Sequence, residues 1–275
     1  MFRLLTGDDF YEVRDYLERN YIEAVVLNSN ITRCGLDNNR MDRRCGDYYG
    51  YFQSGRLRGI LAFYNLGSVI PHFEAAGAAA GFGEIMRQRR FEVLAGMKRV
   101  VEPLYLALRG YKRVLDYEDS HYLLNRESKL PVVAAPVQLA NAGEVERSAA
   151  LGFVVEAYRQ GFNRRFNQEL AVKLIDDRGP EEDFIFLLED GVPKAQAMIQ
   201  VTTNQVSQIG GVYTSASSRK KGFCKMVVAE LCRRILQAGK IPVLTVRKDN
   251  AFACKAYRTI GFTHYDDYIV IKYGV

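Results

Sequence analysis

A short basic segment containing one glycine lies between a predicted strand and a predicted helix, and its residue types suit phosphate binding. The strand is expected over 205–213, and the helix that follows has apolar side chains at helical spacing: Phe223, Val227, Leu231 and Ile235. A helix start offers free N–H groups and the positive end of the macrodipole, which favour a phosphate or pyrophosphate. Three side chains add positive charge there: Arg219, Lys220 and Lys221.

Taken alone, this segment also fits a solvated basic turn that caps a core helix, because short motifs often match by chance. It is not a P-loop, since the chain has no Gly-x4-Gly-Lys-Ser/Thr run. A second segment follows at 246–262. It predicts a helix that starts after Asn250, carries Ala256 and Tyr257, and ends at Gly261-Phe262.

Together, the two segments resemble the GNAT acetyltransferase superfamily. The spacing Arg219-x-x-Gly222-x-Cys224 is similar to the acyl-CoA pyrophosphate loop, usually written Gln/Arg-x-x-Gly-x-Gly/Ala. Cys224 stands where Gly or Ala is usual, and it is small enough to pack like Ala. The run from Asn250 to Phe262 is similar to the end of many GNAT sequences. The resemblance covers roughly residues 137–273.

The resemblance implies acetyl-CoA as the acyl donor and assigns residues to it. Val212 and Thr214 would offer backbone groups to the pantetheine amides, while Tyr213 would point to the opposite side. Asn250 would cap its helix and reach the pantetheine arm, or act as a plain N-cap. Tyr257 would protonate the departing CoA thiolate, or be a core tyrosine. The pyrophosphate would lie on Arg219, Lys220, Lys221, Gly222, Phe223, Cys224 and Lys225.

The general base stays open at this stage. Strand 205–212 has no carboxylate, where many relatives place a Glu. Glu156, Glu189 and Asp190 are candidates, and a water chain or an acceptor amine of low pKa is an equal alternative. We do not expect Cys224 to be a nucleophile, because direct transfer needs no acyl-enzyme.

The order of predicted elements indicates an internal repeat. The second half reads β-α-α-β-β-β-α-β-α-β, and the first half gives nearly the same string. The predicted fold class is α/β (α+β), with tandem GNAT-like mixed β-sheet domains and flanking helices. We expect a degenerate GNAT-like domain at 1–130 and a GNAT N-acetyltransferase domain at 131–275, with a proline-containing connector at 128–136. In the first half, the turn at 75–83 keeps Gly81 and Gly83 but has Ala78 where the loop needs Arg or Gln, so it should not bind CoA.

Some first-half elements are predicted from local signals alone. A helix is expected over 21–28 after the helix capped by Asp8 and Asp9. A further helix is expected over 98–108 with Pro103 near its first turn. Several tyrosines favour strand packing over an acceptor pocket: Tyr48, Tyr49, Tyr51 and Tyr64.

Composition sets limits on the kind of protein. The 275 residues carry a net charge of +6 without a long basic block, so nucleic acid is not expected as a partner. No apolar run is long enough to span a membrane and no signal peptide is recognisable. Five cysteines without a regular framework indicate reduced thiols and a cytoplasmic protein. Cys34 and Cys45 have no nearby partners in sequence, and three histidines form no ligand or triad pattern, so no metal is expected (His72, His121, His264).

The leading hypothesis is therefore an acyl-CoA-dependent N-acyltransferase acting on an amine-bearing acceptor of unknown identity. Alternatives are a non-catalytic acyl-CoA-binding or regulatory module, an aminoacyl-type transferase, and a nucleic-acid-binding protein that uses the basic loop. A homodimer is left open.

Overall fold

The chain divides into two compact units. The computed structural model describes residues 1–127, 137–162, 165–178 and 183–274. Unit 1 comprises Met1–Tyr122, Thr245–Asp249 and His264–Val275, and unit 2 comprises Leu123–Leu244 and Asn250–Thr263. The expected connector at 128–136, with the boundary near residue 130, lies outside the described residues.

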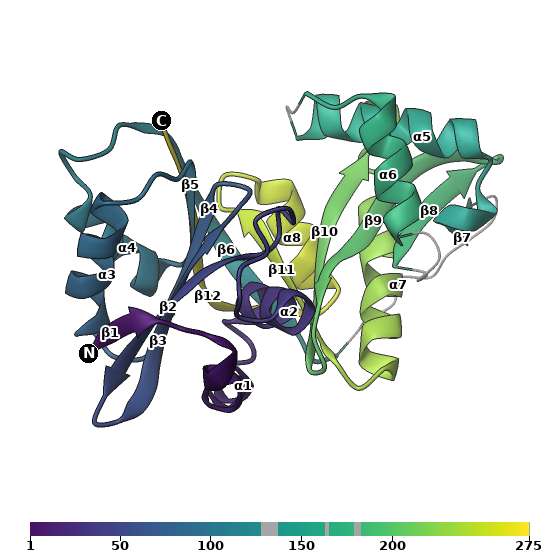
Figure 1. Cartoon of the computed structure of the whole chain (residues 1–275). Helices are drawn as coiled ribbons and strands as arrows, with labels where there is room; N and C mark the ends of the chain where they lie inside the picture. Colours follow the sequence, from purple (N-terminus) through teal and green to yellow (C-terminus); the bar gives the residue numbers. More distant parts are fainter. Residues whose placement is uncertain (128–136, 163–164, 179–182, 275) are drawn as a thin grey trace. The chain divides into compact units, whose positions relative to one another are not determined.

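The first half of the chain contains one copy of the repeated element order (Figure 1). Its strands and helices are β1 (Phe2–Leu4), α1 (Phe10–Arg19), α2 (Val25–Cys34), β2 (Gly46–Gln53), β3 (Arg56–Tyr64), β4 (Ser68–Phe73), α3 (Ala78–Arg87), β5 (Val93–Met97), α4 (Lys98–Ala107) and β6 (Val114–Asn125).

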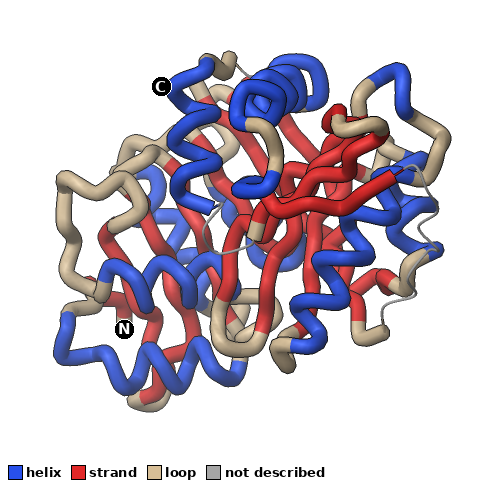
Figure 2. The backbone as a smooth tube through the Cα atoms, turned by 90° about the vertical axis from the view of Figure 1, so that its right-hand side faces the viewer, coloured by secondary structure: helices blue, strands red, loops and turns tan. Residues whose placement is uncertain are grey.

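The second half contains the other copy, so the predicted order β-α-α-β-β-β-α-β-α-β is confirmed. Its elements are β7 (Val137–Asn141), α5 (Arg147–Glu156), α6 (Gln168–Arg178), β8 (Phe184–Glu189), β9 (Val192–Thr202), β10 (Val206–Thr214), α7 (Phe223–Gln237), β11 (Ile241–Arg247), α8 (Ala251–Thr259) and β12 (Phe262–Tyr273). A π-helical turn at Ala157–Gly161 extends α5. The mixture of helices and strands is visible in the backbone tube (Figure 2). Among the described residues, no helix combines the length and apolarity that crossing a membrane requires.

Unit 1 is built on a mixed sheet in the order β1-β2-β3-β4-β5-β12-β6. β4 and β5 are parallel and pair at only two positions, whereas β12 runs antiparallel to β5. On one face, α1 and α2 bury apolar side chains against β2 and β3 (Val13, Leu17, Leu27 and Ile31 against Tyr48, Phe52, Leu57, Ile60 and Tyr64). The other face is covered by α3 and α4 (Figure 1). Because Tyr48 and Tyr64 belong to this core, the packing interpretation of these two tyrosines holds.

Unit 2 has the strand order β11-β10-β9-β8-β7. Phe184, Phe186 and Leu188 on β8 pack with α5 and α6 in one core. Ile185 and Leu187 alternate with them and are also fully buried, because α7 packs against β8, β9 and β10 on the other face. Both faces of the sheet are therefore covered, and α7 is held firmly behind the strands that precede it.

Three local predictions for the first half need correction. The helix expected over 21–28 begins at Val25, because the Asn20 carbonyl accepts hydrogen bonds from Glu23 and Ala24 in a preceding turn. Pro103 is the sixth residue of α4, inside the helix, where buried Val100, Val101 and Leu104 hold it in place. Much of the Gly/Ala-rich stretch expected as a turn is helical, because α3 starts at Ala78.

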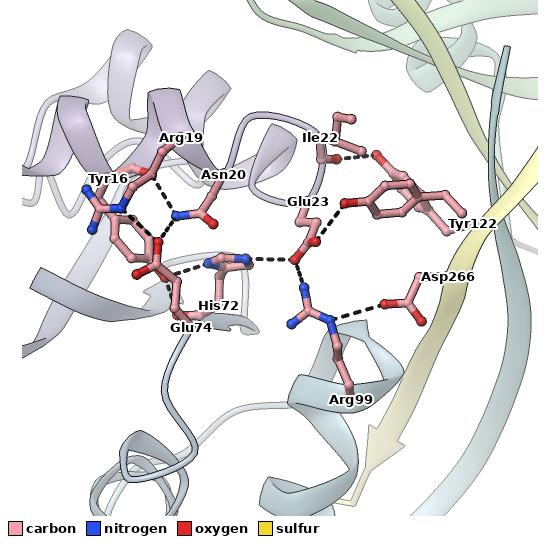
Figure 3. Close-up of polar contacts among 11 residues, drawn as sticks. Tyr16, Arg19, Asn20, Ile22, Glu23, His72, Glu74, Arg99, Tyr122 and Asp266 are labelled. Atoms are coloured by element: carbon pink, nitrogen blue, oxygen red, sulfur yellow. Dashed lines mark hydrogen bonds and ion pairs between the residues drawn. The ribbon is translucent and has the colours of Figure 1, made fainter. Parts of the chain in front are cut away.

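A polar network centred on half-buried Glu23 ties several elements of unit 1 together (Figure 3). The Glu23 carboxylate accepts hydrogen bonds from Arg99 on α4 and from the Tyr265 hydroxyl on β12. It also lies 3.0 Å from Nε2 of His72 on β4. On its other side, His72 Nδ1 lies 2.5 Å from the Tyr16 hydroxyl, which also donates to the His72 backbone carbonyl at 3.1 Å. Burial favours the neutral imidazole, which would donate from Nε2 to the Glu23 carboxylate.

His72 should make the stability of the fold depend on pH. Burial lowers the pKa of His72 to about 4, although nearby Glu74 opposes the shift. An unfolded histidine binds a proton near pH 6.5, so the unfolded state takes up this proton at a higher pH than the folded state does. The free energy of unfolding therefore decreases as the pH falls from about 6.5 to about 4. We expect wild type to lose about 2–3 kcal/mol more unfolding free energy than His72→Gln between about pH 7 and about pH 4.5. Denaturant titrations at both pH values measure this, and an equal loss in the two proteins would show that His72 is not held neutral.

Candidate functional site

The end of β10 separates from its parallel neighbour and leaves one backbone edge open. β10 pairs with β11 only from Val206 to Gln208 and then continues for the six residues 209–214. On its other edge β10 stays paired with β9, with a register shift between Gly210 and Tyr213. The Ser215 N–H donates to the Lys194 carbonyl on the β9 side, so the backbone groups of Thr214 face the opposite, open edge. Val212, the other predicted pantetheine contact, lies in the shifted segment.

The predicted phosphate loop forms the start of α7. A short 3-10 turn at Ala216–Ser218 leads to Arg219, which is extended, and Gly222 is the N-cap residue in a left-handed conformation (φ 85°). Glycine adopts this conformation without the steric cost that a Cβ imposes. The first hydrogen bond of the helix runs from the Lys225 N–H to the Gly222 carbonyl, at 2.9 Å. The N–H groups of Gly222, Phe223 and Cys224 precede it, and they are the donors that a helix start offers to an anion.

The basic side chains of the loop differ in their exposure and in their contacts. Arg219 and Lys220 are exposed. The Lys221 Nζ lies 3.0 and 3.1 Å from the two carboxylate oxygens of Glu189, at the end of β8, and 5.5 Å from the Phe223 ring centroid. The half-buried Lys225 side chain passes close to Gly222. Arg219 and Lys220 thus face solvent, with Arg219 also beside the Tyr213 side chain, while Lys221 is held by an ion pair.

Tyr257 meets the same loop from α8. Its side chain is 6 % exposed, its ring packs on Phe262 at 5.9 Å, and its hydroxyl lies beside the Cys224 thiol. Burial, and then Cys224, raise the pKa of Tyr257 well above its usual value, so the phenol stays protonated. Burial also raises the pKa of Cys224 to about 11, which keeps the thiol protonated and agrees with the expectation that it is not a nucleophile.

Comparisons with known proteins agree with this arrangement. Residues 189–271 match the FR47-like protein family model, which covers the loop and Tyr257. A solved Drosophila protein matches with a TM-score of 0.71 at 12% identity, over 99% of this chain and 98% of that one. A GNAT acetyltransferase from Colwellia psychrerythraea has a TM-score of 0.60 at 13% identity, with 100% of both chains covered. A tandem GNAT protein from the clavulanic acid biosynthesis pathway has a TM-score of 0.60 at 13% identity, over 99% of this chain and 97% of that one. No curated protein matches the chain.

The chain has the tandem GNAT fold. This confirms the predicted fold class and the GNAT resemblance, and the match to the FR47-like model lies in the C-terminal part. The repeat also explains where the first half differs. In the first GNAT repeat Gly77 precedes α3 with an ordinary right-handed backbone (φ −60°), and Gly81 lies inside α3. A Cβ on Gly81 would approach the Phe2 ring to 2.2 Å, so this glycine serves helix–strand packing and forms no loop.

Asn250 occupies the N-cap position of α8 in the second GNAT repeat. Its Oδ1 accepts a hydrogen bond from the Ala253 N–H at 3.1 Å. The N-cap interpretation is therefore confirmed for this oxygen. A contact between Asn250 and the pantetheine arm stays a prediction.

One contact in the second GNAT repeat has no signal in the sequence. The Tyr213 hydroxyl donates a hydrogen bond of 2.9 Å to Glu156 Oε1 at the end of α5, 57 positions away. The Tyr213 ring packs against Phe153 at 5.6 Å and against Gly161, whose missing side chain leaves room for it. Burial, and then Glu156, raise the pKa of Tyr213 to about 12. Glu156 is thereby fixed beside the strand that carries Val212 and Thr214.

Proposed function

We propose that this protein is an acyl-CoA-dependent N-acyltransferase that moves an acetyl group from acetyl-CoA to an amine by direct attack. The observation that carries the proposal is the junction of β10 and α7. There an open strand edge leads into a helix start with a left-handed glycine, and a protonated tyrosine contacts the same helix start. The GNAT fold supports it, because the resemblance implies an acyl-CoA donor.

Each part of the donor has a partner of matching chemistry at this junction. The pantetheine amides would pair with the open edge of β10 at Thr214 and Val212, like an added strand. The pyrophosphate would accept hydrogen bonds from the N–H groups that begin α7, next to exposed Arg219 and Lys220. The pair between Lys221 and Glu189 would hold a third cation beside the loop.

The reaction needs one proton removed and one supplied. The amine nitrogen attacks the thioester carbonyl carbon, the carbon–sulfur bond breaks, and CoA leaves as a thiolate. Tyr257 would give its hydroxyl proton to that sulfur, since its hydroxyl already contacts a sulfur at the start of α7. The amine proton would go to a base on the acceptor side.

Glu156 fits the role of that base better than the other carboxylates predicted from the sequence. It accepts a hydrogen bond from the neutral phenol of Tyr213, which orients the carboxylate without bringing a positive charge to it. Glu189 is paired with Lys221 through both oxygens, and Asp190 lies at a tight turn with φ 53°. We therefore assign proton acceptance to Glu156.

Donor binding should depend on the left-handed glycine at the start of α7. Gly222→Asp puts a carboxylate where the pyrophosphate would lie and strains the backbone, so we expect acetyl-CoA affinity to fall at least about 100-fold, near 3 kcal/mol. Gly239→Asp is the matched control, because Gly239 ends the same helix with φ 72° and has open space around it. Calorimetric titration with acetyl-CoA measures both. Equal affinities for the two variants would remove the loop from the donor site.

Removal of the Tyr257 hydroxyl should slow turnover and leave donor binding intact. Tyr257→Phe keeps the ring contact with Phe262, and we expect kcat to fall about 100-fold while the acetyl-CoA Kd changes less than about twofold. Free-thiol release from acetyl-CoA with a panel of amines, followed across pH, gives the rate. A wild-type rate over the whole pH range would show that Tyr257 is not the acid.

Glu156 and Glu189 give a test of the base. Glu156→Gln should lower kcat/KM at least about tenfold near neutral pH and recover as pH rises, because more of the acceptor is then the free amine. Glu189→Gln, which releases Lys221, should change kcat/KM less than about threefold. Thiol release on the same amines measures both variants. If Glu189→Gln is the slower enzyme, Glu156 is not the base.

The competing functions predict different results. A non-catalytic acyl-CoA module would bind acetyl-CoA and acylate no amine. An aminoacyl-type transferase would require an aminoacyl donor in place of acetyl-CoA. A nucleic-acid-binding role of the basic loop would show RNA or DNA affinity with a steep salt dependence that Arg219→Ala flattens.

A further inference from the structure

Two cysteines and an aspartate meet in unit 1, far from the donor loop in sequence. Cys34 is the last residue of α2, Cys45 directly precedes β2, and Asp42 lies in the loop between them. The two Sγ atoms and a carboxylate oxygen of Asp42 all lie within 4.8 Å of one another. Both thiols are free; Cys45 is buried, and Cys34 and Asp42 are half-buried. Three donor atoms suited to a metal ion thus converge on one place.

The loop that brings them together is fixed by its own hydrogen bonds. Gly35 turns the chain at the end of α2 with φ 71°. The Asn65 amide donates to the Asn39 and Asp42 carbonyls at 2.9 and 2.8 Å, and the Cys45 N–H donates to the Asp42 carbonyl. The Asp42 side chain is itself oriented, because its Oδ1 accepts the Arg44 N–H at 2.8 Å. Its Oδ2 lies 3.8 Å from the exposed Arg33 guanidinium, a longer ion pair than the one between Lys248 and Asp267. Such pre-organisation is what a metal site requires of its supporting residues.

A buried tyrosine supplies an independent observation at the same place. The Tyr48 side chain is 1 % exposed, and its hydroxyl oxygen is buried without a hydrogen bond. Burial, then Tyr64, and then Cys34 and Cys45 raise the pKa of Tyr48, and the Tyr64 hydroxyl is buried without a hydrogen bond as well. A buried polar oxygen without a partner is costly, and a water on a bound ion would give it one.

We propose that Cys34, Asp42 and Cys45 bind a thiophilic divalent cation, for which Zn²⁺ is the representative ion. Zinc is held at about 2.3 Å from sulfur and about 2.0–2.2 Å from carboxylate oxygen in a tetrahedral arrangement, which places two sulfurs about 3.8 Å apart. The observed separations therefore need to close by about 1 Å at most. The fourth position takes water within reach of Tyr48. On binding, each S–H bond breaks, each sulfur bonds to the ion, and two protons go to solvent.

The Asp42 carboxylate favours a bound metal ion over a disulfide between Cys34 and Cys45. A disulfide between Cys34 and Cys45 would use only the sulfurs, and a carboxylate beside them would oppose the thiolate that disulfide exchange needs. In a metal site the same carboxylate is a ligand. The pair looked unsuited to zinc in the sequence because Asp42 had no visible connection to it.

Another group of possible ligands in unit 1 serves as a control. His121, His264 and Asp267 also lie within 4.8 Å of one another, but the Lys248 ammonium is 2.7 Å from Asp267 and already neutralises it. This second group contains no thiol, so Co²⁺ bound to it would lack the near-ultraviolet charge-transfer absorption of a cobalt–thiolate bond.

The test is titration of the reduced full chain with Co²⁺ and then Zn²⁺, with absorption, proton release and competition against a chromophoric chelator. We expect thiolate–cobalt absorption that saturates at one ion per chain, displacement by Zn²⁺, and release of two protons. Cys34→Ser, Cys45→Ser and Asp42→Asn should each weaken Zn²⁺ binding at least about tenfold. The controls Cys254→Ser, Asp37→Asn and His264→Ala should keep it within about twofold.

A wild-type measurement covers the case in which a variant does not fold. Zn²⁺ should slow alkylation of Cys34 and Cys45 at least about tenfold, read peptide by peptide by mass spectrometry, and leave Cys224 unchanged. Absence of thiolate–cobalt absorption would overturn the proposal. So would a Cys34–Cys45 disulfide that forms under mild oxidation at the same rate with and without Zn²⁺.

Discussion

The candidate site depends on one constraint, the short pairing between the parallel strands β10 and β11. The two strands share only three paired positions, after which β10 continues while staying bound to β9 on its other edge. A strand in the middle of a sheet would have no backbone groups to offer. Because β10 loses this neighbour after Gln208 and then leads through a short turn into α7, the open edge ends close to the helix start in the chain. This gives a long donor molecule a place for its amides and a place for its phosphates.

The first repeat shows that the strand arrangement alone does not make such a site. β4 and β5 are also parallel, pair at two positions, and are followed by a helix. The difference lies in the turn. Gly222 adopts a left-handed conformation that turns free N–H groups outward, and exposed cations surround it. In the first repeat the glycine at 81 is used inside α3 to let Phe2 pack. The same fold therefore contains one turn with the features of an anion site and one in which the glycine serves packing.

Polar groups inside the two units serve different ends. In unit 1, Glu23 and His72 contact each other and also Arg99 and Tyr16 (Figure 3). Tyr265 donates to Glu23 as well, so these contacts connect the helices to β4 and β12. In unit 2, Tyr213 contacts Glu156, and Tyr257 contacts Cys224. These are separate pairs rather than a network, and they lie next to the donor loop. A network in which the hydrogen-bonding groups satisfy one another stabilises a fold, whereas the hydrogen bond from Tyr213 orients a single carboxylate, that of Glu156.

The sequence by itself determined the repeated element order, the loop around Gly222 and the helix capped by Asn250. These are local properties: hydrophobic periodicity, a glycine that a tight turn needs, and a capping side chain three residues before the N–H that donates to it. It misplaced the start of α2, where the turn after Asn20 depends on hydrogen bonds rather than periodicity. Only the tertiary structure decided that Tyr257 meets Cys224, that Glu156 meets Tyr213, and that Asp42 lies beside Cys34 and Cys45. Such contacts depend on how strands pair and how loops close, and no periodicity or spacing along the chain encodes the distance between two side chains brought together by that pairing.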